Sequence, residues 1–238
     1  MRPITPAAQA WILLAMTPLV PWIALVPGGR WLLPLVAPLT VWAAFRNRVR
    51  LKDYVGAWSL GMIWAGLLSL GVVAQVFLTP DLAATVLNGE AYRQEMFDWI
   101  RTGEGSEGEP LRFLPVHLLH LAAFVLLTWL SAGYLGLALG ALLTGYMSYF
   151  VGSYAAAAGS PLLGSILAWV PWSVIRVMAF VLLGALFARP LLMRRVWPFG
   201  PYERRLLLLG LAGILADIVM KAFAADRYGL LLRSFAGW

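Results

Sequence analysis

The sequence predicts an all-α protein that crosses a membrane several times, and its composition and the length of its apolar runs support this prediction. Of the 238 residues, 61% are hydrophobic and 12% are charged, whereas an average soluble domain has about 25% charged residues. A helix needs about 20 mainly apolar residues to cross a hydrocarbon layer roughly 30 Å thick. Several such runs follow one another, so we predict a polytopic bundle of about seven transmembrane helices.

Residue counts exclude several kinds of site. The chain has no cysteine, so disulfides, thiolate metal sites and cysteine nucleophiles are excluded. Its two histidines, His117 and His120, are too few for paired axial ligation of two haems. The net charge of +7 lies mostly in short loops between apolar runs, which indicates membrane topology and not nucleic-acid binding. We therefore predict no cofactor and no nucleic-acid partner.

Residues 1–45 hold two short apolar runs, over residues 11–26 and 31–45, joined by a turn at 27–30. Prolines interrupt the first run and no small-residue cleavage site follows it, so we interpret this segment as retained membrane structure and not as a signal peptide. Each run is short for a full span. The segment is therefore either a proline-bent hairpin that crosses twice, or one span with a re-entrant or interfacial companion.

Longer spans are predicted within residues 55–225. The first covers residues 55–78 and follows the basic loop 46–54, in which four positive charges fall within seven residues. Residues 113–159 carry almost no charge and are about twice as long as one span, so they predict a helical hairpin that turns near Ser131. The last two spans cover residues 161–188 and 206–225, and an arginine-rich loop at 189–205 separates them.

The distribution of charge predicts the side of the membrane on which each loop lies. Residues 79–112 are the sizeable polar segment, with seven acidic residues and three arginines. Basic residues concentrate in the short loops 46–52 and 189–205, which the positive-inside rule places in the cytoplasm. We therefore predict a multi-pass protein of the inner (plasma) membrane with a cytoplasmic N-terminus, an outer acidic loop and an interfacial tail at 226–238. Sixteen arginines against two lysines suggest a bacterium with GC-rich DNA.

Three charged side chains lie inside predicted spans. Asp217 and Lys221 are four residues apart in the last span, so they share one helix face and can pair. An intramembrane charge usually faces the protein interior and serves a function, which makes Asp217 a candidate for proton or ion coupling. The alternative is that Lys221 extends to the outer surface and Asp217 only neutralises it. Arg176 can bind a lipid headgroup, pair with Asp217, or extend toward the outer interface.

His117 and His120 are three residues apart near the outer end of a span, so they share a helix face. Such a pair can supply two metal ligands, but no local motif supplies a third. We therefore predict no metal site, and a structural hydrogen-bonding role for both histidines at the outer interface.

The outer loop contains a predicted amphipathic helix over residues 90–101, with apolar side chains at i, i+4, i+7 and i+8. This helix can dock on a partner protein or rest on the bilayer surface, since an apolar stripe serves both. A flexible acidic connector follows at residues 102–110. The stripe consists of Tyr92, Met96, Trp99 and Ile100.

Small residues recur at the spacing that lets membrane helices approach closely. Such faces serve either the folding of one chain or its assembly with other chains, including copies of itself. The positions are Gly61, Ala65, Gly136, Gly140 and Gly145.

The glycine series Gly136, Gly140 and Gly145, together with the order of spans over residues 55–225, resembles the stage II sporulation protein M family. One long span, an outer polar helix, an uncharged hairpin and two further spans are shared, whereas residues 1–45 depart from this layout. Five-span Yip1-type proteins are similar in layout. The resemblance implies a scaffold or a transporter-type membrane domain within a complex, and it carries over no catalytic residue.

Enzyme signatures such as HExxH, GxSxG and a Walker A loop are absent from the sequence. We therefore expect a non-enzymatic scaffold or permease-like subunit that works in the lipid bilayer with other membrane subunits or as a homo-oligomer. One alternative is a small secondary transporter that uses Asp217, Lys221 and Arg176. Another is an intramembrane enzyme that acts on lipid, which requires His117, His120 and Arg176 around one pocket.

Overall fold

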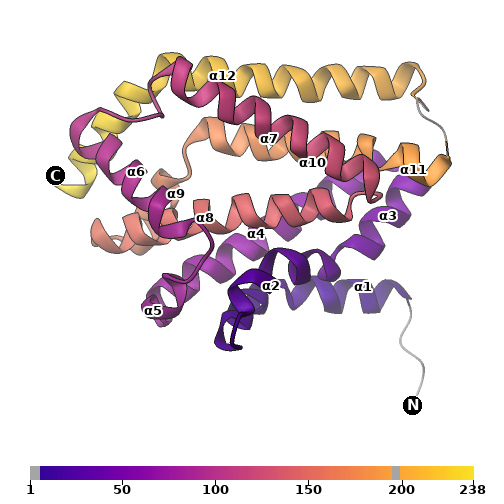
Figure 1. Ribbon diagram of the computed structural model, residues 1–238, viewed down its shortest axis with the longest axis horizontal. Helices are drawn as coiled ribbons and strands as arrows, with labels where there is room; N and C mark the ends of the chain where they lie inside the picture. Colours follow the sequence, from indigo (N-terminus) through magenta and orange to yellow (C-terminus); the bar gives the residue numbers. More distant parts are fainter. Residues whose placement is uncertain (1–5, 195–198) are drawn as a thin grey trace.

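Helices form the architecture of the protein (Figure 1). The computed structural model describes residues 6–194 and 199–238, and no strand occurs in these ranges. Five helices are long and apolar enough to cross a membrane, which confirms the predicted all-α membrane bundle. They are α4 (Tyr54–Leu78), α7 (Pro110–Leu130), α8 (Tyr134–Ala157), α10 (Pro171–Phe187) with its extension α11 (Arg189–Met193), and α12 (Pro201–Ala236).

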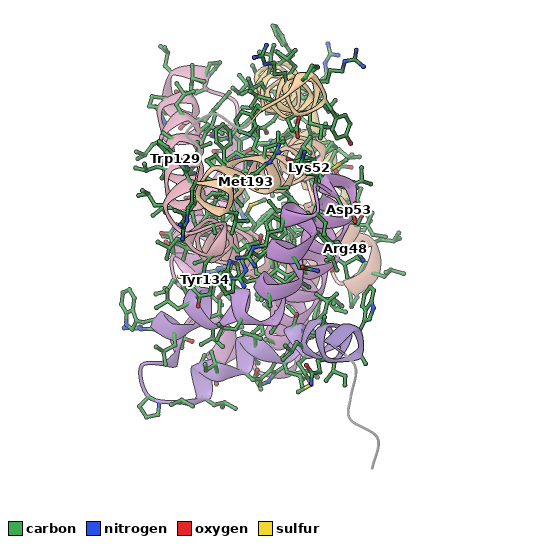
Figure 2. All side chains as sticks on the ribbon, turned by 90° about the vertical axis from the view of Figure 1, so that its right-hand side faces the viewer. Arg48, Lys52, Asp53, Trp129, Tyr134 and Met193 are labelled. Atoms are coloured by element: carbon green, nitrogen blue, oxygen red, sulfur yellow. The ribbon has the colours of Figure 1, made fainter. Side chains whose placement is uncertain are left out.

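The long helices run along the long axis of the molecule, which therefore has two ends (Figure 1). The basic end carries α11 and the loop before α4, and Figure 2 looks onto it, with Lys52 and Met193 labelled. The acidic end carries α6 (Gly89–Thr102), the short helices α5 (Pro80–Ala83) and α9 (Pro161–Ala168), and the C-terminus. The basic loop 46–52 and the acidic loop 79–112, which charge assigns to opposite sides of the membrane, thus lie at opposite ends of the bundle.

Residues 6–50 form a broken hairpin and not two straight spans. The outward limb consists of α1 (Pro6–Ala15) and the 3-10 helix η1 (Thr17–Leu25), which are bent by 48° relative to each other. Proline breaks these helices because it lacks an N–H donor and clashes with the preceding turn. The bent limb is one broken span or a re-entrant loop, so the described residues hold five or six candidate spans, fewer than the predicted seven. The return limb consists of α2 (Gly29–Val36), η2 (Ala37–Thr40) and α3 (Trp42–Arg50).

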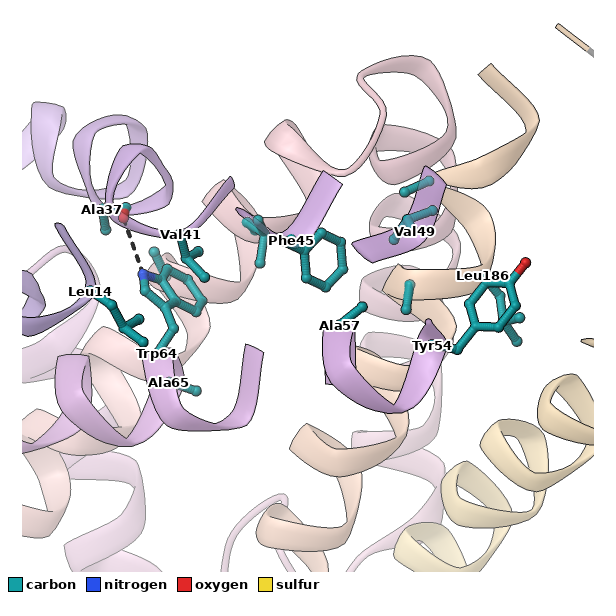
Figure 3. Packing of buried hydrophobic residues seen from close by; sticks show 14 of the residues in the cluster. Leu14, Ala37, Val41, Phe45, Val49, Tyr54, Ala57, Trp64, Ala65 and Leu186 are labelled. Atoms are coloured by element: carbon teal, nitrogen blue, oxygen red, sulfur yellow. Dashed lines mark hydrogen bonds between the residues drawn. The ribbon is translucent and has the colours of Figure 1, made fainter. Parts of the chain in front are cut away.

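Side chains of α4 hydrogen-bond to backbone carbonyls of this hairpin. A carbonyl freed by a broken helix finds no water in the membrane core, so it needs a donor from the protein. Gln75 Nε2 donates to the Pro21 carbonyl at 3.3 Å, and Trp64 Nε1 donates to the Ala37 carbonyl at 3.1 Å. Figure 3 shows the second bond inside a cluster of buried apolar side chains. The hairpin is therefore attached to the bundle by polar contacts as well as by packing.

Two of the predicted small-residue positions are close helix contacts within this chain. A Cβ atom at Gly136 would lie 1.9 Å from Thr128 Oγ1, so α7 and α8 approach closely there. A Cβ atom at Gly61 would lie 2.5 Å from the Val181 side chain, which brings α4 against α10. The remaining predicted positions, which have looser contacts or are simply buried in the core, are Ala65, Gly140 and Gly145.

The apolar stripe of α6 lies inside the protein. Met96, Trp99 and Ile100 are each at most 1% exposed and pack in one cluster with side chains of α8, α10 and α12. Tyr92 of the same stripe lines a cavity. The prediction that the stripe docks on a partner or on the bilayer is therefore wrong. An apolar period reveals that a helix face is buried, but it does not reveal which apolar surface covers that face.

The C-terminal tail continues the last span. α12 runs unbroken to Ala236 and extends past α7 at the acidic end (Figure 1). The Tyr154 hydroxyl donates to the Leu232 carbonyl at 2.7 Å, and Arg233 Nε donates to the Ile100 carbonyl at 2.7 Å. The segment expected as a separate interfacial tail therefore joins α12 to α8 and α6.

Candidate functional site

A polar cavity of about 380 Å³ lies between α6, α7, α8, α10 and α12 in the acidic half of the bundle. Both α7 and α10 begin at the acidic end. His117 therefore lies roughly 10 Å, and Arg176 roughly 8 Å, from the start of its helix, at a helical rise of about 1.5 Å per residue. The charged side chains that line the cavity are Glu95, Glu107, Arg112, Arg176, Asp217 and Lys221.

Lys221 and Glu107 form a buried ion pair at the acidic end of this cavity. Lys221 Nζ donates to Glu107 Oε1 at 2.7 Å, and the side chains are 2% and 5% exposed. The other oxygen, Glu107 Oε2, accepts from Trp172 Nε1 at 3.0 Å. Lys221 Nζ also lies 4.5 Å from the centre of the Phe113 ring, a cation–π distance. Both charges therefore have the partners that a buried ion pair needs.

This pairing differs from the one that the sequence predicts, in which Asp217 pairs with Lys221 along the helix. The predicted partner lies on the same helix, whereas the actual partner lies in the segment interpreted as a flexible connector. A contact between positions 107 and 221 leaves no local pattern in the sequence. The available signal is a general one: a buried lysine near the acidic loop needs a carboxylate, and that loop supplies seven acidic residues.

Asp217 is fully buried and its carboxylate is unsatisfied. Neither oxygen has a hydrogen-bond partner among the residues that the structure describes. The nearest basic nitrogens are His117 Nε2 at 3.6 Å and Arg176 Nε at 3.9 Å, both beyond hydrogen-bond length. A buried carboxylate without hydrogen bonds is unfavourable by several kcal/mol unless it binds a proton or a donor group. Asp217 is therefore a candidate to bind a proton or the donor group of a ligand.

Arg176 and His117 contact each other beside Asp217. His117 Nδ1 lies 3.0 Å from the Phe113 carbonyl, which only accepts, so Nδ1 carries the ring proton. Nε2 is then the acceptor for an Arg176 N–H group. Arg176 also donates to Ser173 Oγ at 2.8 Å. His117 thus orients the guanidinium, and Arg176 is directed to the cavity and not to the outer interface.

The remaining lining adds a second histidine and an aromatic wall. His120 is half-buried and lines the same cavity as His117. His117 is buried in the bundle and does not lie at the outer interface, where the sequence predicts it. The rings of Tyr92 and Tyr146 lie 4.7 Å apart on the opposite part of the lining. Within residues 6–194 and 199–238, no group of three or more His, Asp or Glu side chains is arranged to hold a metal ion.

A second cavity, of about 60 Å³, lies toward the basic end and is lined almost entirely by apolar side chains. Its far lining includes Phe45 and Gly133. The hydroxyl of Thr128 also lines it, and this oxygen has no hydrogen-bond partner in the described part of the chain. The two cavities adjoin each other. The side chains that line both are Leu143, Met147, Arg176 and Phe180.

A second buried ion pair lies at the basic end. Arg189 of α11 donates to Glu203 Oε1 of α12, and the Tyr54 hydroxyl donates to the same oxygen at 3.3 Å. The other oxygen of Glu203 accepts from the Gly200 backbone N–H at 3.0 Å. Near each end of the bundle, α12 is therefore held to another segment by a buried ion pair, through Glu203 at the basic end and Lys221 at the acidic end.

No family model matches the chain, and neither the curated proteins nor the solved structures contain a match. The resemblance to the stage II sporulation protein M family and to Yip1-type proteins therefore stays a prediction. Fold and site together define a class: an all-α, multi-pass membrane protein with a polar cavity inside one half of its bundle.

Proposed function

We propose that the protein is a small secondary transporter, in which the polar cavity binds a solute and Asp217 couples its movement to that of a proton or cation. The observation that carries this proposal is the state of Asp217, which is fully buried, lines the cavity and has no hydrogen bond to either oxygen from the described residues. Buried carboxylates with a structural role are normally hydrogen-bonded. Ionisable residues that face a cavity inside a membrane bundle are typical of ion and proton pathways.

The two adjoining cavities support transport over static binding. Transporters expose a central site alternately to the two sides, which requires a closure on each side of the site. We assign the buried Lys221–Glu107 pair as the closure toward the acidic end. We assign the side chains shared by the two cavities and the buried Arg189–Glu203 pair as the closures toward the basic end. By the positive-inside rule, the basic end faces the cytoplasm and the polar cavity belongs to the outer half of the membrane.

The geometry gives less support to the other two functions. A scaffold was expected to present the α6 stripe to partners, but that stripe packs within the chain. An enzyme acting on lipid needs His117, His120 and Arg176 at one pocket, and all three line the same cavity. However, both ring nitrogens of His117 are engaged, by the Phe113 carbonyl and by Arg176, so His117 is not a free general base.

Uptake by proteoliposomes tests the proposal. The labelled solutes are L-leucine, putrescine, succinate and glucose, which represent zwitterionic, cationic, anionic and neutral molecules. With an imposed pH gradient or sodium gradient, we expect at least one solute to accumulate, and an ionophore that dissipates that gradient to abolish its accumulation.

Asp217→Asn should abolish this accumulation, whereas Asp226→Asn, at an exposed carboxylate on the same helix, should not. Uptake that is unchanged in Asp217→Asn would contradict the coupling role. A wild-type protein that accumulates none of the four solutes would contradict transport.

A further inference from the structure

We infer that the ligand of the polar cavity is a small zwitterion of the α-amino acid class, with its ammonium group bound by Asp217 and its carboxylate bound by Arg176. The inference rests on the proposed function for its setting. It concerns binding, however, which is measured without transport.

The first argument is the balance of charge around the cavity. The lining holds as many carboxylates as permanent cations, so a ligand with a net charge gains little from the cavity as a whole. A simple cation at Asp217 would meet the charges of Arg176 and Lys221. A simple anion at Arg176 would meet those of Asp217 and Glu107. The three carboxylates are Glu95, Glu107 and Asp217, and the three cations are Arg112, Arg176 and Lys221.

The second argument is that only some of these charged groups already have a hydrogen-bonded partner of opposite charge. Lys221 and Glu107 neutralise each other at 2.7 Å. Asp217 has no hydrogen bond to either oxygen from the described residues, and its ion pair with Arg176 is long, at 3.9 Å. Arg176 donates its hydrogen bonds to two neutral acceptors, one of which is His117. The cavity therefore offers one carboxylate and one guanidinium whose charges are not neutralised by a hydrogen-bonded partner, and a zwitterion supplies the complement of both.

The third argument is the distance between these two groups. Arg176 Nε lies 3.9 Å from Asp217 Oδ2, too far for a hydrogen bond yet close enough for one small molecule to contact both. In an α-amino acid the ammonium and carboxylate groups are attached to a single carbon atom, which suits two neighbouring sites. A guanidinium presents its donors in a planar fork that matches a carboxylate, and an ammonium group brings three donors to the unsatisfied Asp217.

The rest of the lining favours an apolar or aromatic side chain on this ligand. Tyr92 and Tyr146 form an aromatic wall, and Phe180 and Ile214 add apolar surface. A volume of about 380 Å³ lies within the range of small-molecule sites and leaves room for a side chain the size of leucine or phenylalanine.

A matched set of ligands, added to the purified full-length protein in mild detergent, tests the inference. The set is L-leucine, its methyl ester, which keeps only the ammonium charge, and its des-amino analogue, which keeps only the carboxylate. γ-Aminobutyrate carries both charges further apart. We expect L-leucine to raise Tm, because a ligand that binds the folded state stabilises it. In equilibrium dialysis, the three analogues should bind about tenfold more weakly or worse, because each loses one of the two charge-assisted contacts.

Variants locate the site. We expect Asp217→Asn and Arg176→Gln each to weaken the binding of L-leucine by about tenfold or more, and Asp226→Asn to leave it unchanged. If either cavity variant fails to fold, the ligand series on the wild-type chain decides the question alone.

Several outcomes overturn the inference. Equal binding of the methyl ester and L-leucine would define a cation site, and equal binding of the des-amino analogue would define an anion site. Absence of L-leucine binding to the folded wild-type protein would also end the proposal. The proposed function is judged separately, since uptake of another solute that depends on Asp217 would keep the transporter while removing its amino-acid ligand.

Discussion

Lys221 on the last helix donates to Glu107 in the acidic loop at 2.7 Å, although 114 positions separate the two residues in the chain. This bond holds the loop against α12 at the acidic end of the polar cavity. Because Lys221 pairs with Glu107, it does not pair with Asp217, which lies one helical turn away on the same helix. The unsatisfied carboxylate on which the proposed function rests is therefore a consequence of the Lys221–Glu107 pair.

Glu107→Gln should destabilise the protein, because it leaves Lys221 as an uncompensated buried charge. We expect the free energy of unfolding to fall by about 3–5 kcal/mol. Combining Glu107→Gln with Lys221→Met should recover most of this loss, since the second change removes the stranded charge. Thermal or denaturant unfolding in detergent measures both variants. Losses that simply add in the double variant would show that the two residues are not coupled.

Asp217→Asn should have the opposite effect on stability while it abolishes transport. Replacing a fully buried carboxylate that lacks hydrogen bonds with a neutral amide removes a desolvation penalty, so we expect Tm to rise. The gain should be small, about 1 kcal/mol, because the amide is itself polar and because Arg176 loses its nearest carboxylate. The matched control, Asp226→Asn, should change stability by less than about 0.5 kcal/mol because that residue is exposed. A large loss of stability in Asp217→Asn would instead assign Asp217 a structural role.

Gly136→Ala should destabilise the contact between α7 and α8. Its Cβ atom would lie 1.9 Å from Thr128 Oγ1 and 3.2 Å from the Thr128 Cα atom, so the Thr128 side chain must rotate or one helix must shift. We expect a loss of about 1–3 kcal/mol, as for other overpacked sites. Gly66→Ala is the matched control, since a Cβ atom there meets nothing within 4 Å and alanine favours helix. Equal unfolding midpoints for the two variants would contradict the close packing of these helices.

Asp53 at the basic end should give the protein an acid-sensitive contribution to stability. Its side chain caps α4 by accepting from the Gly56 backbone N–H at 2.8 Å, and it also accepts from Arg48 at 2.6 Å. Figure 2 shows Arg48 and Asp53 at this end. The backbone hydrogen bond and then the Arg48 contact lower the pKa of Asp53 below its ordinary value of 3.8.

A carboxyl whose pKa is lower in the folded state stabilises the protein above its unfolded pKa. We therefore expect this contribution to be complete above about pH 5 and to disappear as the pH falls below 3.8. Asp53→Ala should lose about 1 kcal/mol at neutral pH, as for other helix caps. The difference in Tm between wild type and Asp53→Ala, measured against pH, should shrink in acid. A difference that is constant down to about pH 2 would contradict the capping role.

The long spans could be predicted because apolar length is a property of consecutive residues. Helix α4 begins and ends within a residue of the predicted span, since Asp53 caps its start and Thr79-Pro80 follows its end. The hairpin before it could not be placed from the sequence. Prolines indicate where helices break, but not which donors satisfy the freed carbonyls, and the bond from Gln75 to Pro21 spans 54 positions.

The site was predictable in part for the same reason. Lys221 and Asp217 were identified because charge inside an apolar run is visible locally, and both are buried as the rule for intramembrane charges expects. Glu107 was missed because the acidic loop offers several equivalent carboxylates and only the tertiary fold selects one of them. The α6 stripe was misassigned because the periodicity of a helix reports burial and not the identity of the neighbour.

Side-specific thiol labelling tests the central claim, that the two cavities form a path opened alternately from either side. Since the chain has no cysteine, each introduced thiol reports on one position alone. Lys52→Cys at the basic end and Glu104→Cys at the acidic end define the two sides of sealed vesicles. Transport predicts that an impermeant maleimide labels His120→Cys from the Glu104 side and Thr128→Cys, in the deeper cavity, from the Lys52 side. If Thr128→Cys is labelled from neither side, yet reacts once the protein is unfolded, the path does not open and the account is wrong.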